Sequence, residues 1–335
     1  MKPVRCHVAR PFVSAVLAAV LMLGAGASLA GCASSDGDNN NNNSTTTTGS
    51  SSSGGYSFTD ALGTQVTVNK PQRVVACMGS FAAIWELSGG SLVGVTDDAV
   101  QDYNIASSVT SVGEFNAPSL EAIIALDPDF VIMTASSSGQ AGTTSQTSLK
   151  EGLESSGITV AYFQVTTFED YLAMLETCTN ITGRSDLYEK NGTAVLTAID
   201  EIRASVGDGP RPTVLLMTTY SGGTRVQGSS TMTGAMLHDL KADNLADQNA
   251  SLLRDFSLEA VIEANPDFIF VVPMGLDDAA ALRNLEEATE TNPAWAALDA
   301  VKNGRYIILD KKYFQYKPNE RWAESYQILY DKLYG

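Results

Sequence analysis

Short apolar runs alternate with helical patterns along most of the chain. The runs are bounded by turn residues and read as buried strands, at Arg73–Cys77, Leu92–Val95, Phe130–Thr134, Thr159–Phe163, Thr213–Met217 and Arg305–Leu309. Helical stretches between the runs are typical of parallel βαβ units, so the pattern predicts an α/β fold with parallel-rich central sheets. Before them, Tyr56–Val68 alternates around an Ala-Leu-Gly turn, which predicts an opening hairpin.

One segment of this pattern occurs twice. Ser119–Thr134, SLEAIIALDPDFVIMT, returns at Ser257–Val272 as SLEAVIEANPDFIFVV with eight identical positions. Each copy reads as a capped helix, a Pro-Asp turn and a buried strand. A widely spaced repeat of this kind predicts two similar α/β lobes with a ligand cleft between them.

A long helical pattern separates the two copies. Phe168–Ile181 and Ser185–Val206 are predicted helices, broken at Gly183, and the second is long enough, at roughly 33 Å, to join the lobes. The predicted division is an N-terminal lobe at 56–184, a linker helix at 185–206 and a C-terminal lobe at 207–335. Ser136–Ser148 and Ser221–Thr233 read as loops, whereas a closing helix would bury Trp322, Tyr326, Leu329 and Leu333.

The N-terminus has the features of a lipoprotein leader. Basic residues precede the apolar stretch Phe12–Leu23, and Leu-Ala-Gly-Cys ends at Cys32. We expect residues 1–31 to be a signal peptide, Cys32 to carry lipid, and 32–55, a polar tract, to form a disordered tether. The alternative is an uncleaved membrane anchor. Cleavage and lipidation would place the folded part outside the cytoplasm, attached to the bacterial cell membrane by lipid.

Charge and residue types exclude several functions. The formal net charge is −17, and it becomes −20 once residues 1–31 are removed, so nucleic acid is not an expected partner. Without its leader the chain retains only His238, too few histidines for a bare zinc or manganese site or for a histidine-based hydrolase, so we predict no enzyme activity, cofactor or metal. Cys77 and Cys178 are expected to be buried; whether they pair is left open.

The repeat places an acid near the start of each predicted helix. Ser119 and Ser257 are good N-caps, and Glu121 and Glu259 fall in the first turn. Capping alone would explain both acids. In a parallel α/β layer, however, helices begin at the edge where ligands bind, so the two acids would flank the cleft in a pseudo-twofold arrangement.

Together, the leader, the tether, the paired Ser-Leu-Glu…Pro-Asp boxes and the linker helix resemble the cluster A substrate-binding proteins. These proteins serve ABC importers of ferric siderophores, haem and cobalamin. The resemblance covers about 66–333 and implies that Glu121 and Glu259 dock onto a permease dimer that works with its ATPase. It also implies a monomer that captures a small molecule, an iron complex (a ferric siderophore or haem) in preference to a corrinoid. A ligand-sensing lipoprotein partnered with a membrane receptor would share the fold.

Ligand contacts are predicted mainly from strand ends. This rule selects Met78, Ser80, Asp97, Thr134 and Gln164 in the first lobe, and Tyr220 and Met274 in the second. Phe115 matches a cleft-lining aromatic position of the family that the chain resembles. Tyr103 lies in the preceding loop, and Arg225 could pair with an anionic ligand. Tyr313 and Tyr316, after the last strand, are weaker candidates.

Overall fold

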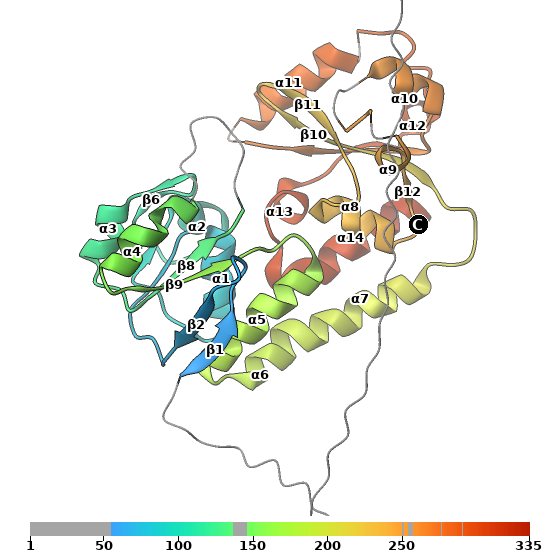
Figure 1. Cartoon of the computed structure of the whole chain (residues 1–335). Helices are drawn as coiled ribbons and strands as arrows, with labels where there is room; N and C mark the ends of the chain where they lie inside the picture. Colours follow the sequence, from blue (N-terminus) through green and yellow to red (C-terminus); the bar gives the residue numbers. More distant parts are fainter. Residues whose placement is uncertain (1–54, 137–145, 250, 254–256, 276, 290) are drawn as a thin grey trace, which may run out of the picture. The chain divides into compact units, whose positions relative to one another are not determined.

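The computed structural model describes residues 55–136, 146–249, 251–253, 257–275, 277–289 and 291–335, which belong to one compact unit. Its first sheet is wholly parallel, in the order β5-β4-β3-β8-β9, of which β8 and β9 are labelled in Figure 1. The strands are β3 (Val74–Ala76), β4 (Gly94–Val95), β5 (Thr110–Ser111), β8 (Phe130–Thr134) and β9 (Thr159–Phe163). Two antiparallel pairs accompany it: the predicted opening hairpin, β1 (Tyr56–Thr59) with β2 (Gln65–Val68), and β6 (Gly113–Glu114) with β7 (Ala117–Pro118).

The second sheet has the order β11-β10-β13-β14, with β12 also pairing with β10. Its strands are β10 (Thr213–Tyr220), β11 (Gly223–Gln227), β12 (Asp243–Asn244), β13 (Phe268–Pro273) and β14 (Tyr306–Ile308). The prediction of a loop over Ser221–Thr233 was wrong, because it contains β11. This strand forms a hairpin with β10 through Gly223, whose φ of 147° lies outside the range other residues favour. The β-branched residues Thr224 and Val226 then suit the paired strand.

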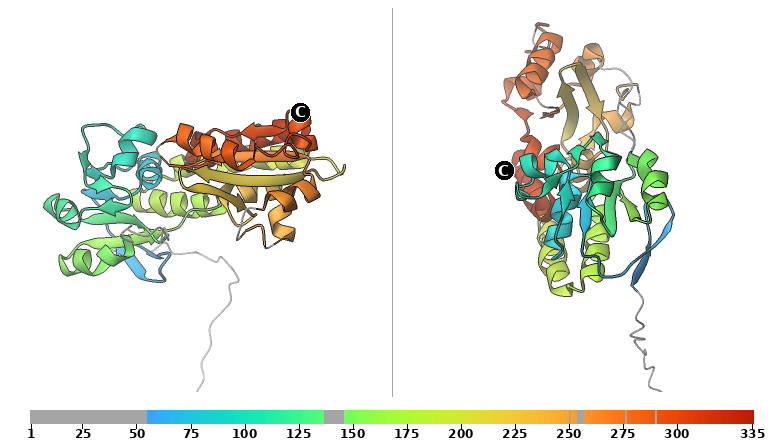
Figure 2. Two further views of the ribbon diagram at one scale, coloured as in Figure 1. Left: turned by 90° about the horizontal axis from the view of Figure 1, so that it is seen from above. Right: turned by 90° about the vertical axis from the view of Figure 1, so that its left-hand side faces the viewer.

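Helices cover the strands as the periodicity predicts. They are α1 (Gly79–Leu87), α2 (Asp97–Asp102), α3 (Leu120–Ala125), α4 (Lys150–Ser155), α5 (Phe168–Thr182), α8 (Met232–Asp239), α9 (Leu245–Gln248), α10 (Leu258–Ala264), α11 (Asp278–Thr289), α12 (Asp299–Lys302), α13 (Lys311–Phe314) and α14 (Trp322–Tyr334). Helices lie on both faces of the second sheet (Figure 2, left), and successive residues of its central strands enter two different apolar clusters. This confirms the α/β class. None of the described helices is long and apolar enough to cross a membrane.

The sequence repeat is also a structural repeat. Ser119 caps α3 by accepting from the backbone N–H of Ala122 at 3.2 Å, and Ser257 caps α10 by accepting from Ala260 at 3.3 Å. A left-handed residue follows each helix, Asp127 (φ 46°) after α3 and Asn265 (φ 42°) after α10, each just before the proline of the turn. The two copies of the repeated segment therefore begin and end their helices in the same way.

The aspartate of each Pro-Asp turn fastens the repeated strand to the first strand of its lobe. The Asp129 carboxylate accepts from the N–H groups of Gln72 (2.7 Å) and Arg73 (3.0 Å), directly before β3. The Asp267 carboxylate accepts from the N–H of Thr213 (2.8 Å), where β10 begins. The strands then pair in the same register, Val74 with Phe130 and Val214 with Phe268. The two lobes therefore share one central construction.

The predicted linker helix is present, with one feature that the sequence does not indicate. Helix α5 ends at Gly183 (φ 75°), as expected, and a helical run follows through α6 (Ser185–Tyr188) and α7 (Ala194–Ser205). Between them, Glu189–Thr193 forms a π-helical turn. Asn191 in this turn is buried, and its side-chain amide donates to the carbonyl of Leu87 at 2.9 Å.

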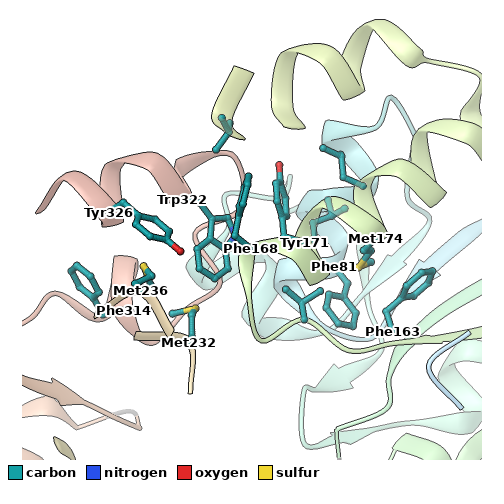
Figure 3. Close-up of a cluster of buried hydrophobic side chains, with 14 of the residues drawn as sticks. Phe81, Phe163, Phe168, Tyr171, Met174, Met232, Met236, Phe314, Trp322 and Tyr326 are labelled. Atoms are coloured by element: carbon teal, nitrogen blue, oxygen red, sulfur yellow. The ribbon is translucent and has the colours of Figure 1, made fainter. Parts of the chain in front are cut away.

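One apolar cluster continues from the first lobe into the second. In Figure 3, Trp322 and Phe168 lie between Phe81, Phe163 and Met174 on one side and Met232, Met236, Phe314 and Tyr326 on the other. The rings of Phe168 and Trp322 meet edge to face, with centroids 5.9 Å apart. Beside the cluster, Arg203 of α7 pairs with Asp239 of α8, and Asp239 also accepts from the Tyr326 hydroxyl at 2.6 Å. The lobes are therefore joined by packed side chains as well as by the linker.

This packing leads us to expect only modest closure when ligand binds. A wide hinge motion would have to separate the rings of Phe168 and Trp322 and expose apolar surface, which costs free energy. We expect solution X-ray scattering with and without ligand to show a change in radius of gyration below about 1 Å. A compaction of several ångströms would contradict a stiff helical hinge.

Candidate functional site

The carboxyl-terminal edge of the first sheet is the natural place for a ligand. The chain leaves β3 toward β4 and β5 on one side and later adds β8 and β9 on the other, so the strand order reverses between β3 and β8. Ligands of open α/β sheets bind outside such a reversal. Met78, half-buried, directly precedes α1 here, and Thr134, buried, is the last residue of β8. Two predicted ligand contacts therefore lie at the expected edge.

A residue that sequence reasoning missed holds this edge together. Gln146 is 3% exposed, and its side-chain amide donates to the carbonyls of Cys77 (2.6 Å) and Phe115 (2.9 Å). The same amide accepts from the N–H of Thr134 at 3.0 Å. It thus connects the segments that carry Met78, Phe115 and Thr134. A glutamine at the end of a Ser/Gly/Thr-rich segment gives no local signal of this role.

Tyr103 joins the first lobe to the segment after the last strand. Its hydroxyl accepts from the N–H of Lys317 at 3.0 Å, and its ring lies 6.2 Å from that of Tyr316. Burial raises the pKa of the Tyr103 phenol above its ordinary value, and the nearby charge of Asp98 adds to the increase. A cavity of about 90 Å³ lies beside these residues. Tyr103 is therefore neutral at physiological pH and serves as an interlobe contact in this structure.

Ser80 has a different environment from the other predicted contacts. It is fully buried in the first turn of α1, and its carbonyl accepts from the side chain of Asn319 at 3.0 Å. The contact is a second link between the first lobe and the segment before α14. In this conformation the Ser80 side chain is not accessible to a ligand, whereas the half-buried Phe115 and Met78 are partly exposed.

In the second lobe, the predicted residues lie at the corresponding strand ends. Tyr220 ends β10, and the guanidinium carbon of Arg225 on β11 is 5.5 Å from the centre of its ring. Met274 follows β13, and its N–H donates to the carbonyl of Thr219 at 2.8 Å. Arg225 is exposed and has no ion pair within the described part of the chain. Its charge is therefore available to an anionic ligand.

The structure thus forms two groups of predicted ligand contacts. Gln146 brings together the segments of Met78, Phe115 and Thr134, and the hairpin of β10 and β11 brings together Tyr220 and Arg225. Among the residues described, two predicted contacts bond across to the other lobe: the Tyr103 hydroxyl accepts from the N–H of Lys317, and the Ser80 carbonyl accepts from the Asn319 side chain. A larger hollow of about 490 Å³ lies between α7 and α14, lined by residues such as Glu201 and Gln327, and none of its lining residues is a predicted ligand contact. All these assignments stay predictions.

The two predicted docking acids have equivalent surroundings. Glu121 and Glu259 are exposed in the first turns of α3 and α10, and each accepts a hydrogen bond from its capping serine, at 3.2 and 3.4 Å. Neither forms an ion pair among the residues that the structure describes. Capping uses the serine oxygens, so both carboxylates are free to meet a cationic partner.

Other predictions from the sequence have different outcomes. Cys77 and Cys178 are buried and unpaired, and burial raises the pKa of the Cys178 thiol to about 12, so both behave as small apolar residues. His238 is exposed in the last turn of α8, beside Asp239. The predicted lipidation site Cys32 and the tether lie outside the described residues, as does most of the predicted loop Ser136–Ser148.

The fold and its two strand-end edges define a two-lobed binding protein. The sequence matches the periplasmic binding protein family over residues 74–313, and the chain belongs to that family. It is 24% identical over 264 residues to the Fe(3+)-citrate-binding protein YfmC of Bacillus subtilis, with 75% of this chain and 77% of YfmC covered.

Solved structures with the same fold include two from Staphylococcus aureus. SirA complexed with staphyloferrin B has a TM-score of 0.62 and 20% identity, covering 83% of this chain and 97% of SirA. IsdE complexed with heme has a TM-score of 0.63 and 15% identity, covering 78% of this chain and 99% of IsdE. The predicted family resemblance and fold class are confirmed.

Proposed function

We propose that this protein captures a ferric complex outside the cytoplasm and delivers it to an ABC importer. Membership of the periplasmic binding protein family supports a binding role without turnover. The observation that carries delivery is the pair of ion-pair-free acids, Glu121 and Glu259, at equivalent helix starts of two similar lobes. In this proposal they dock the protein, as a monomer, onto the two subunits of a permease that works with its ATPase. Cys32 would hold it to the membrane by lipid.

The Arg225 cation and the similarity to a ferric-citrate-binding protein favour an anionic iron chelate over haem. Haem iron in proteins takes an axial side-chain ligand such as histidine, tyrosine or methionine. Of the residues at the two edges, Tyr220, Met78 and Met274 could supply such a ligand, whereas the Tyr103 hydroxyl is bonded to Lys317. Arg225, by contrast, offers an unpaired cation beside Tyr220, which suits carboxylate or catecholate groups on iron. The similarity to the Fe(3+)-citrate-binding protein supports the same ligand class.

Cobalamin is the second candidate ligand. The partly exposed Phe115 and Met78 on one edge, with Tyr220 and Met274 on the other, provide flat and polarisable surfaces that also suit a corrin. A ligand-sensing lipoprotein would use the same edges, but its docking partner would be a membrane receptor.

Ligand titration of residues 56–335 tests the proposal. We expect ferric citrate or another ferric siderophore complex to bind and to carry its visible absorption with the protein, whereas haem and cyanocobalamin do not. Arg225→Gln should weaken that binding by about 10- to 100-fold, because a charge-assisted contact is lost. Arg283→Gln, an exposed arginine on α11, is the matched control and should leave the affinity unchanged. Tight binding of cyanocobalamin alone would overturn the iron assignment and leave the transport role intact.

A further inference from the structure

The first sheet contains an interruption at its ligand edge that the second sheet lacks. Along β3 and β8 the bonds follow a regular parallel ladder, in which Cys77 N–H donates to the Ile132 carbonyl at 2.9 Å. The next bond of such a ladder would run from Thr134 N–H to the Cys77 carbonyl. Instead, the Gln146 amide lies between them, accepting from Thr134 at 3.0 Å and donating to Cys77 at 2.6 Å. The side-chain amide takes the place of a peptide group.

The equivalent position of the second lobe shows that this is not a requirement of the fold. When Val74 is aligned with Val214 and Phe130 with Phe268, Met217 is the second-lobe equivalent of Cys77 and Val272 is the equivalent of Thr134. There, β10 and β13 stay directly paired through Thr219 and Pro273, and Met274 N–H then donates to the Thr219 carbonyl. Among the described residues, therefore, only the first of the two similar lobes has a side-chain amide inserted between these strands.

The side-chain amide of Gln146 has hydrogen-bond partners for its oxygen and for both of its hydrogens. Both hydrogens of the Gln146 amide are used, the second donating to the Phe115 carbonyl at 2.9 Å. Its own backbone carbonyl accepts from the buried hydroxyl of Tyr162 on β9 at 3.1 Å. A buried amide with every group paired fixes the positions of its partners, because losing any bond would leave a buried polar group without one.

We propose that Gln146 is a positioning residue for ligand binding, an inference that rests on the proposed function. By separating the ends of β3 and β8 at the point where the strand order reverses, it sets the spacing between Met78 and Thr134. Its third bond holds the turn that carries Phe115 against the same edge. In this proposal Gln146 does not contact the ligand. It positions the residues that form the ligand-binding surface.

Two near-isosteric variants of the full-length protein, purified in detergent, test this role. Gln146→Met keeps the length of the side chain and removes all three bonds. Asn244→Leu is the control: Asn244 is 4% exposed, bonds Gln227 and Ala246, and lies where β12 meets the amino-terminal end of β10. We expect both variants to lose thermal stability. Only Gln146→Met should weaken ferric citrate binding, by about tenfold or more, while Asn244→Leu stays within about twofold.

Amide hydrogen exchange supplies a readout that needs no ligand. In Gln146→Met, exchange should accelerate in segments 74–78 and 130–135, whereas in Asn244→Leu it should accelerate around 243–246. Unchanged affinity or unchanged exchange at the β3–β8 edge in Gln146→Met would overturn the proposal. If the wild-type protein binds no ferric complex, the proposed function fails. The exchange measurement alone then shows whether Gln146 fixes the ends of β3 and β8. Gln146→Glu, which keeps the shape and the acceptor but loses both donors, replaces the methionine variant if that does not fold.

Discussion

Replacing Glu121 and Glu259 together by alanine should nearly abolish delivery of the ligand while leaving its affinity within about twofold. Both carboxylates are exposed and unpaired within the described residues, so in the free protein they stabilise little beyond their helix starts. Against a cationic pocket on a permease, removing one partner of a desolvated charge pair costs the complex about 2–5 kcal/mol, largely because the other charge is left unpaired. Losing two should therefore weaken docking by at least a hundredfold, measurable as ligand-stimulated ATPase activity of the importer in proteoliposomes.

The double variant Glu151→Ala with Glu263→Ala is the matched control. Both residues are exposed helical glutamates, and their loss changes the net charge by the same amount. This control should transport normally, which separates docking from the general effect of charge. Normal transport by the Glu121/Glu259 double variant, or a loss of ligand affinity in it, would show that the two acids are helix caps or ligand contacts instead.

Trp322→Ala should lower the free energy of unfolding by about 3–5 kcal/mol and also loosen the contact between the lobes. The indole is 1% exposed and packs edge to face on Phe168 of α5, at the centre of the cluster that spans both lobes (Figure 3). Without it, the apo protein should have a larger radius of gyration and should compact more when ligand binds. Urea unfolding and solution scattering would measure the two effects.

Trp295→Ala separates stability from interlobe coupling. Trp295 is also buried, at 2% exposure, but it packs on Tyr306 within the core of the second lobe. We expect a similar loss of stability and no change in the scattering difference between apo and bound protein. If both variants behave alike in scattering, the Phe168–Trp322 contact does not restrain the lobes.

Local sequence patterns were sufficient to predict most helices and strands of this chain. Phe130–Thr134 and Thr159–Phe163 are strands with the predicted bounds, and α5 ends at Gly183 as expected. These succeed because buried strands, caps and left-handed helix ends depend on a few neighbouring residues. β11 was missed because its Gly/Ser/Thr-rich composition resembles a loop, and its strand conformation depends on pairing with β10.

The sequence by itself determined the α/β class, the duplicated unit and the equivalent positions of Glu121 and Glu259. A repeat can be recognised from the order of residues alone, because it needs no information on contacts between distant segments. Only the tertiary structure decided how the ligand edge is assembled. Gln146 reaches partners 12, 31 and 69 residues away, and Tyr103 meets Lys317 across 214 residues. Nothing near Gln146 in the chain selects those partners. They are set by the strand order, which brings the ends of β3 and β8 together around one buried amide.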